Sequence, residues 1–223
     1  FDKVIFNVIK DDRVAFESFK KGEMSFYYFY ADGLDLWAKE TGGKDFNGGK
    51  FVKLDFPRAY PSSWRGVALN MRREPTSDLR FRKALQHLFN PALYTKKIFH
   101  GLQEPIRGPF GNWSEYASPN LKAPAYDPKL AGKLLKEAGY TKVDKDGVLY
   151  KETKGKKQRA EITVMFAYQP HEKYLTIWKE DAKKAGIKLN LKYTEWAAAS
   201  KLVDDWKFDG FVIGWGGGPI PSP

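Results

Sequence analysis

The sequence predicts an α/β fold in which a mixed β-sheet is flanked by helices. Short apolar segments with a period of two alternate along the chain with segments whose apolar residues recur at helical spacing. Several helical segments also begin at a capping residue and end at a glycine. The 223 residues, 42% of them hydrophobic, are enough for one sizeable core or two small ones.

The N-terminal part is expected to begin as strand, helix, strand, helix. Residues 2–9 alternate apolar and polar side chains, and Asp11 or Asp12 can cap a helix that Gly22 ends. A short aromatic strand at 26–30 follows, and Asp32 or Gly33 then opens a second helix that runs to Thr41.

The middle of the chain adds two strands, two helices and a long loop. Pro57 to Ser63 is expected to turn between the two strands, Ser77 or Asp78 to cap the first helix, and Pro91 to occupy the first position of the second. The predicted elements are strands at 51–56 and 64–71, helices at 76–88 and 90–98, and a loop at 101–124.

The last hundred residues continue the alternation. The helix opened by Asp127 and Pro128 and ended by Gly139 has the clearest signals in the chain. The elements predicted after it are a hairpin of 148–150 with 160–166 across a basic loop, a helix at 168–185, a strand at 187–193, a helix at 195–206 and a strand at 208–215.

The final strand leads to Trp215, three glycines and three prolines. Glycines remove side chains beside the indole, so that a ligand or another backbone can approach closely. One interpretation is therefore an aromatic ligand contact at an edge of the fold, and the other is a Trp packed over a Gly-rich turn as part of the core.

Composition excludes several kinds of chemistry. The chain has no cysteine, which rules out disulfides, thiolate metal sites and cysteine nucleophiles but leaves cytoplasm and periplasm both open. No apolar run is long enough to span a bilayer. The net charge of +11 is spread over predicted helices and turns, and the dense run at 154–159 falls in the expected hairpin loop.

A catalytic centre is not expected. His87, His100 and His171 fall in different elements, without a metal-ligand spacing, and are interpreted as surface or cap residues. The glycines after Trp215 lack the Lys-Ser/Thr that a phosphate-binding loop needs. The sequence therefore predicts no catalytic residues, no metal site and no cofactor.

Several segments together resemble the periplasmic solute-binding proteins of peptide-class, or family 5, ABC transporters. Each is a weak motif, and their order and spacing make the resemblance specific. They are Phe1-Asp-Lys-Val-Ile-Phe6, Phe19-Lys-Lys-Gly-Glu23, Leu69-Asn70, Asp78 to Leu85, Tyr126 to Ala131, Leu134 to Tyr140, Ala185-Gly-Ile-Lys-Leu, Phe208-Asp209 and Gly214-Trp-Gly.

The resemblance implies one lobe of a two-lobed, type II-like binding protein that encloses a peptide between its lobes and delivers it to a membrane permease in the periplasm. Residues 1–223 would be most of the second lobe, with the first lobe and the C-terminal remainder absent. Phe110 to Trp113, Ser118 to Leu121 and the closing Gly/Pro segment look most like the YejA-type proteins of this class.

The resemblance and the residues together give a set of candidate ligand contacts. Arg65 and Arg107 could meet a ligand carboxylate, although a salt bridge is the alternative for each. In oligopeptide-binding relatives an Asp that pairs with the ligand amine stands three residues after the Trp, and here that position is Gly218. The full set is Trp215, Gly216, Gly217, Arg65, Arg107, Trp113 and Tyr168.

Two alternatives remain. The same fold could take a non-peptide cargo, such as a nickel complex, an opine or an oligosaccharide. From a different class, a basic nucleic-acid-binding module would also account for the net charge, although no nucleic-acid partner is expected.

Overall fold

The computed structural model describes residues 2–9, 11–29, 33–54, 63–103, 105–108, 112, 114–153 and 155–216. The chain divides into two compact units. The first is Phe1–Pro57 with Thr95–Gln103, and the second is Arg58–Tyr94 with Glu104–Pro223.

The first unit contains α1 (Asp12–Lys20), α2 (Leu34–Glu40) and α3 (Lys44–Asn47). The carboxylate of Asp11 caps α1 by accepting from the backbone N–H groups of Arg13 and Val14, as one of the two predicted caps requires. Its core is aromatic, because the buried ring of Phe16 contacts the rings of Phe19, Tyr27, Phe29 and Phe46.

The strands predicted near the N-terminus are wrong in the part that the structure describes. Residues 2–9, 26–29 and 51–54 have no strand pairing with any described residue. Phe6 and Val8 are 87% and 91% exposed, so their alternation with polar residues is not matched by a buried face here. The aromatic segment instead contributes rings to the core around Phe16.

The second unit is built on a mixed four-stranded sheet, as predicted, with the order β1-β7-β5-β6. The strands are β1 (Ser63–Leu69), β5 (Glu161–Phe166), β6 (Lys188–Tyr193) and β7 (Gly210–Gly216). β1 runs antiparallel to β7, while β5 runs parallel to both β6 and β7.

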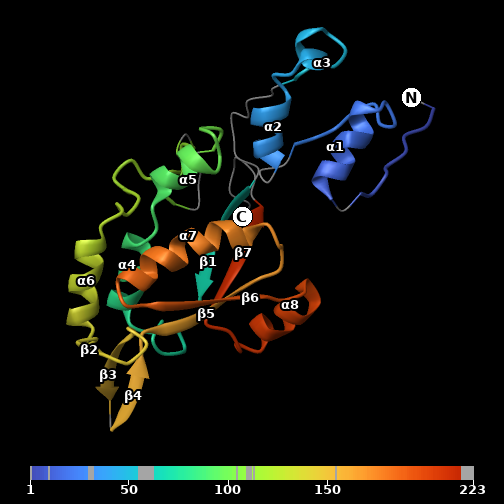
Figure 1. Cartoon of the computed structure of the whole chain (residues 1–223). Helices are drawn as coiled ribbons and strands as arrows, with labels where there is room; N and C mark the ends of the chain where they lie inside the picture. The colour runs from blue at the N-terminus through green and yellow to red at the C-terminus, as the bar shows by residue number, and fades with distance from the viewer. Residues whose placement is uncertain are drawn as a thin grey trace. The chain divides into compact units, whose positions relative to one another are not determined.

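Helices cover both faces of this sheet (Figure 1). α4 (Leu79–His87), α6 (Pro128–Glu137) and α7 (His171–Lys184) lie on one side and α8 (Trp196–Asp204) on the other, while α5 (Pro91–Lys97) follows α4 along the chain. α4, α6 and α7 form the larger core with Ile162, Val164 and Phe166 of β5. α8 covers Met165 and Phe211, whose side chains point to the opposite face.

A second, smaller sheet has the order β2-β3-β4, with β2 at Lys142–Val143, β3 at Leu149–Thr153 and β4 at Lys156–Arg159. The predicted hairpin of 148–150 with 160–166 is therefore wrong. β3 pairs with β4, which includes most of the basic run taken for a loop. Residues 161–166 carry buried side chains on both faces, which suits a central strand of the main sheet.

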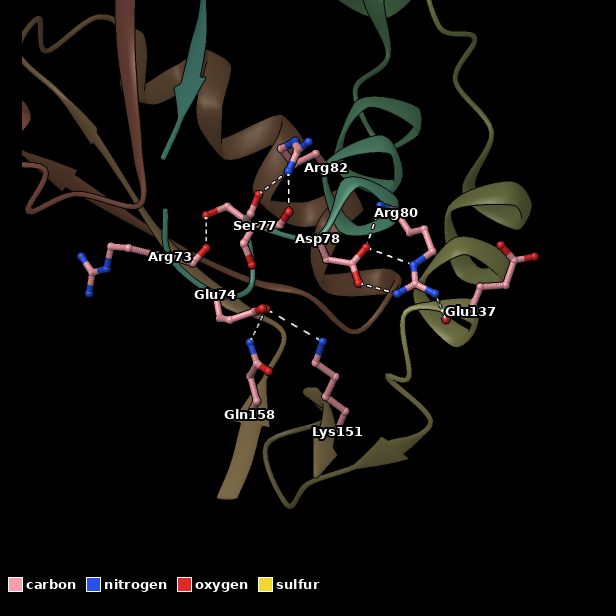
Figure 2. Close-up of polar contacts among 10 residues, drawn as sticks. Arg73, Glu74, Ser77, Asp78, Arg80, Arg82, Glu137, Lys151 and Gln158 are labelled. Carbon is pink, nitrogen blue, oxygen red and sulfur yellow. Dashed lines mark hydrogen bonds and ion pairs between the residues drawn. The ribbon is translucent and has the colours of Figure 1, made fainter. Parts of the chain in front are cut away.

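A polar network holds the segment before α4 against its neighbours (Figure 2). The Arg80 guanidinium donates two hydrogen bonds to the Asp78 carboxylate, at 3.0 and 2.7 Å, and a third to the backbone oxygen of Glu137 at 2.6 Å. Glu74 accepts from Gln158 at 2.8 Å and lies 3.8 Å from Lys151. α4 is thereby tied both to the end of α6 and to the small sheet.

Candidate ligand-binding site at the carboxyl edge of the sheet

The carboxyl ends of β5, β6 and β7 lie at one edge of the main sheet, since the three strands are parallel. In open α/β sheets, ligands bind outside this edge. Four exposed aromatic side chains follow or end these strands, with 38 to 58% of their surface exposed: Tyr168 after β5, Tyr193 and Trp196 at the end of β6 and the start of α8, and Trp215 in β7.

Trp215 stacks on Trp64, which lies directly opposite it in the β1–β7 pair. The ring centroids are 4.4 Å apart and the ring planes differ by 23°. Trp215 keeps 38% of its surface exposed. This exposure does not fit the second of the two interpretations of the sequence, in which Trp215 was part of the core. The pair therefore presents an aromatic surface at the end of two strands.

Two glycines leave the other face of β7 bare at this edge. Gly214 and Gly216 alternate with Trp215, so side chains at these positions would point to the α7 face. A Cβ on Gly216 would meet nothing within 4 Å, whereas one on Gly214 would lie 3.4 Å from Cγ of Arg65. Gly217 and Trp113, which were also predicted to contact the ligand, lie outside the described residues.

Arg65 lies on the α7 face, opposite to the Trp pair, because it alternates with Trp64 along β1 and shares its face with Val67. Its guanidinium Nη1 is 3.4 Å from Nε2 of His171, the first residue of α7. The guanidinium can only donate, so this contact is a hydrogen bond only when Nε2 carries a lone pair. Tyr168 packs edge-on against the same imidazole, with the ring centroids 5.1 Å apart.

Arg107 is engaged within its own loop. Its backbone N–H and its Nε both donate to the side-chain oxygen of Asn112, at 3.0 and 3.1 Å, and Nη2 donates to the Asn112 backbone oxygen. Asn112 in turn donates to the backbone oxygen of Pro105. None of these contacts involves the carboxyl edge, so the structure gives Arg107 a role in shaping the loop.

Four residues at this edge were not singled out by the sequence. Trp64 and Tyr193 were treated as members of strands, Trp196 as a member of a helix, and His171 as a surface or cap residue. Their placement depends on pairing between distant segments, namely the register of β1 on β7 and the contact of Trp196 with Phe211 at 6.0 Å. The available signal was the position of Trp196 just after a predicted strand.

The edge also has a polar contact. The Tyr193 hydroxyl donates to the Glu195 carboxylate at 2.8 Å, and this hydrogen bond raises the pKa of Tyr193. Among the residues that the structure describes, no three His, Asp or Glu side chains gather in a way that could hold a metal ion. No described helix is long and apolar enough to cross a membrane.

The architecture is that of a solute-binding protein. The whole chain, residues 1–223, matches the model of the bacterial extracellular solute-binding proteins, family 5, and the chain belongs to this family. Curated relatives include the oligopeptide-binding protein AppA of Bacillus subtilis, 25% identical over 99% of this chain and 39% of its own length. YejA of Escherichia coli is 30% identical over 54% of this chain and 19% of its own.

Solved structures show the same fold. AppA of Bacillus subtilis in complex with a nonapeptide superposes with a TM-score of 0.74 at 24% identity, over 96% of this chain and 41% of its own. NikZ of Campylobacter jejuni in complex with Ni(L-His) gives the same TM-score and identity, over 96% of this chain and 39% of its own. The chain thus spans about two fifths of these relatives, and the relatives themselves bind different cargoes.

Proposed function

We propose that the protein is the periplasmic binding component of an ABC importer, and that it binds peptides at the carboxyl edge of its main sheet. Residues 1–223 would be the second of two lobes that enclose the ligand, and hinge closure would present the loaded protein to the permease. The observation that carries the proposal is the exposed Trp215, stacked on the half-buried Trp64 beside the bare backbone of Gly216.

Peptide is favoured over other cargoes because the edge offers three complementary kinds of contact. Bare backbone at Gly216 can approach the amides of an extended ligand, and the Trp pair can bury apolar side chains. Arg65, which lies against His171, offers a cation to a ligand carboxylate. A peptide would use both faces by crossing the end of β7 at Gly216, where a Cβ would meet nothing within 4 Å.

The first experiment is native mass spectrometry of the protein isolated from its own cells, to identify the ligand that co-purifies. A distribution of short peptides supports the proposal. Trp215→Ala is expected to lose this ligand, while Trp206→Ala, which removes another half-exposed Trp at the opposite end of β7, keeps it. A single nickel complex, opine or oligosaccharide would replace the peptide proposal by the alternative cargo.

A second experiment tests the carboxylate contact. Calorimetry with a co-purified peptide is repeated with its C-terminal amide, in the original protein and in Arg65→Gln. If Arg65 meets the carboxylate, the substitution weakens binding of the free acid about tenfold or more and leaves the amide unaffected. Equal losses for the two ligands would mean that Arg65 has only a structural role.

A further inference from the structure

The net positive charge of the chain comes almost entirely from the second unit. The first unit has 11 basic and 10 acidic side chains, whereas the second has 27 basic and 17 acidic ones. The excess of +10 in the second unit is therefore a property of its surface and not an average over the chain. Its densest part is the segment from Lys122 through α6 to the small sheet.

Six exposed lysines lie along the segment from residue 122 to residue 156, and we call them the basic ridge: Lys122, Lys129, Lys133, Lys136, Lys145 and Lys156. Lys129, Lys133 and Lys136 follow one another at spacings of four and three along α6, so they share its outer stripe. Within the described residues, the only ion pair that any of the six makes is that of Lys133 with Glu137, at 3.9 Å. The ridge is therefore largely uncompensated.

The ridge lies away from the carboxyl edge. α6 runs directly into β2, and the small sheet lies beside this end of α6 (Figure 1). β4 leads into Glu161, the first residue of β5, and the backbone N–H of Leu149 donates to Gly186 just before β6. The small sheet therefore adjoins the amino ends of β5 and β6, opposite to Trp215.

We propose that the basic ridge docks onto anionic phospholipid headgroups, an inference that rests on the proposed function because delivery to a permease brings the protein to a membrane. Lysines act as mobile point charges, which suits phosphates without fixed geometry. Leu130 and Val143, 36% and 61% exposed, stand beside the ridge and can enter the headgroup region. α6 has no aromatic residue for stacking nucleic-acid bases. Docking there leaves the ligand edge free.

The test is co-sedimentation with vesicles of pure phosphatidylcholine and of phosphatidylcholine with one third phosphatidylglycerol. Binding is expected only to the anionic vesicles, and to fall steeply between 0.05 and 0.5 M salt, conditions chosen from the screening length. The triple change Lys129→Glu, Lys133→Glu and Lys136→Glu is expected to weaken binding at least a hundredfold, from about fivefold per lysine removed.

The matched control changes Lys192, Lys201 and Lys207 to Glu, which alters the net charge equally on exposed positions of β6, α8 and the turn after α8. Circular dichroism checks that both variants are folded. Equal losses of vesicle binding in the two variants would contradict the proposal that the basic ridge is the binding surface. Equal binding to neutral vesicles, or binding to duplex DNA without binding to vesicles, would also contradict it. Ligand binding is measured separately, so failure of this surface is distinguishable from failure of the proposed peptide site.

Discussion

Both the backbone conformation and the side-chain packing at position 186 require a glycine. Gly186 follows α7 with a φ of +81°, and a Cβ there would lie 2.7 Å from Cγ of Leu149. Gly186→Ala therefore combines backbone strain with overpacking and is expected to lower the free energy of unfolding by about 2–4 kcal/mol. Denaturant titration followed by circular dichroism measures the change.

Gly147→Ala separates these two effects. Gly147 has a similar φ of +77°, but a Cβ there would meet nothing within 4 Å. Its substitution is expected to cost only the strain, about 1 kcal/mol. If the two variants were equally stable, the contact with Leu149 would contribute nothing at Gly186.

Asn70 fixes the end of β1 to the start of β7. Its side-chain N–H groups donate to the backbone oxygens of Trp206 and Phe208, at 3.0 and 2.8 Å, and its side-chain oxygen accepts from Arg72. Only 1% of Asn70 is exposed, so Asn70→Ala leaves buried groups without partners and is expected to cost about 2–4 kcal/mol. Gln158→Ala, which removes one exposed hydrogen bond to Glu74, is the control and should cost under about 0.5 kcal/mol. Similar losses in urea titrations would contradict this reasoning.

At the scale of elements, Asp78, the N-cap residue of α4, makes the stability of the fold depend on pH. The hydrogen bond from the Arg80 side chain lowers the pKa of the Asp78 carboxyl, an effect that outweighs burial and is reinforced by the Arg80 backbone N–H. The carboxylate thus stabilises the fold fully above its unfolded pKa of about 3.9, and this stabilisation is lost as the pH falls through the lower folded value.

Asp78→Asn retains a capping oxygen but removes the charge. It is expected to reduce stability at pH 7 by about 1 kcal/mol and to flatten the pH dependence of unfolding below pH 4. Asp204→Asn, at the exposed end of α8, is the matched control for the same change of side chain. An unaltered acid profile in Asp78→Asn would mean that other carboxylates govern it.

Apart from the short α3, which was not predicted, the helices could be predicted closely because their signals are local. Asp127 and Pro128 set the start of α6, and Gly139, with a φ of +92°, follows its end. Strand pairing could not be predicted in the same way, because the partner of a strand lies elsewhere in the chain. The residue patterns of β4 and β5 did not show that β4 pairs with β3 and that β5 pairs with β6 and β7. The same reason limited the site: the glycines pointed to Trp215, whereas its stacking on Trp64 and the opposite facing of Arg65 depend on the register of β1 and β7.

At the scale of the whole molecule, the two units differ in the depth of their cores. Among the buried hydrophobic residues of the described chain, only Ala15 and Phe16 belong to the first unit. Local stability follows buried apolar contact, so amides of α1 and α2 are expected to exchange at least tenfold faster than those of β5. Hydrogen exchange followed by mass spectrometry of peptides from each unit measures this difference.

Two core substitutions show whether the units unfold separately. Phe16→Ala removes the ring at the centre of the first unit's aromatic core and is expected to abolish protection in α1 while leaving β5 protected. Leu135→Ala, in the core shared by α4, α6 and α7, is expected to lower protection in β5 by the free energy of its cavity, about 2–5 kcal/mol. Loss of protection in both units from Phe16→Ala would instead show one cooperative structure.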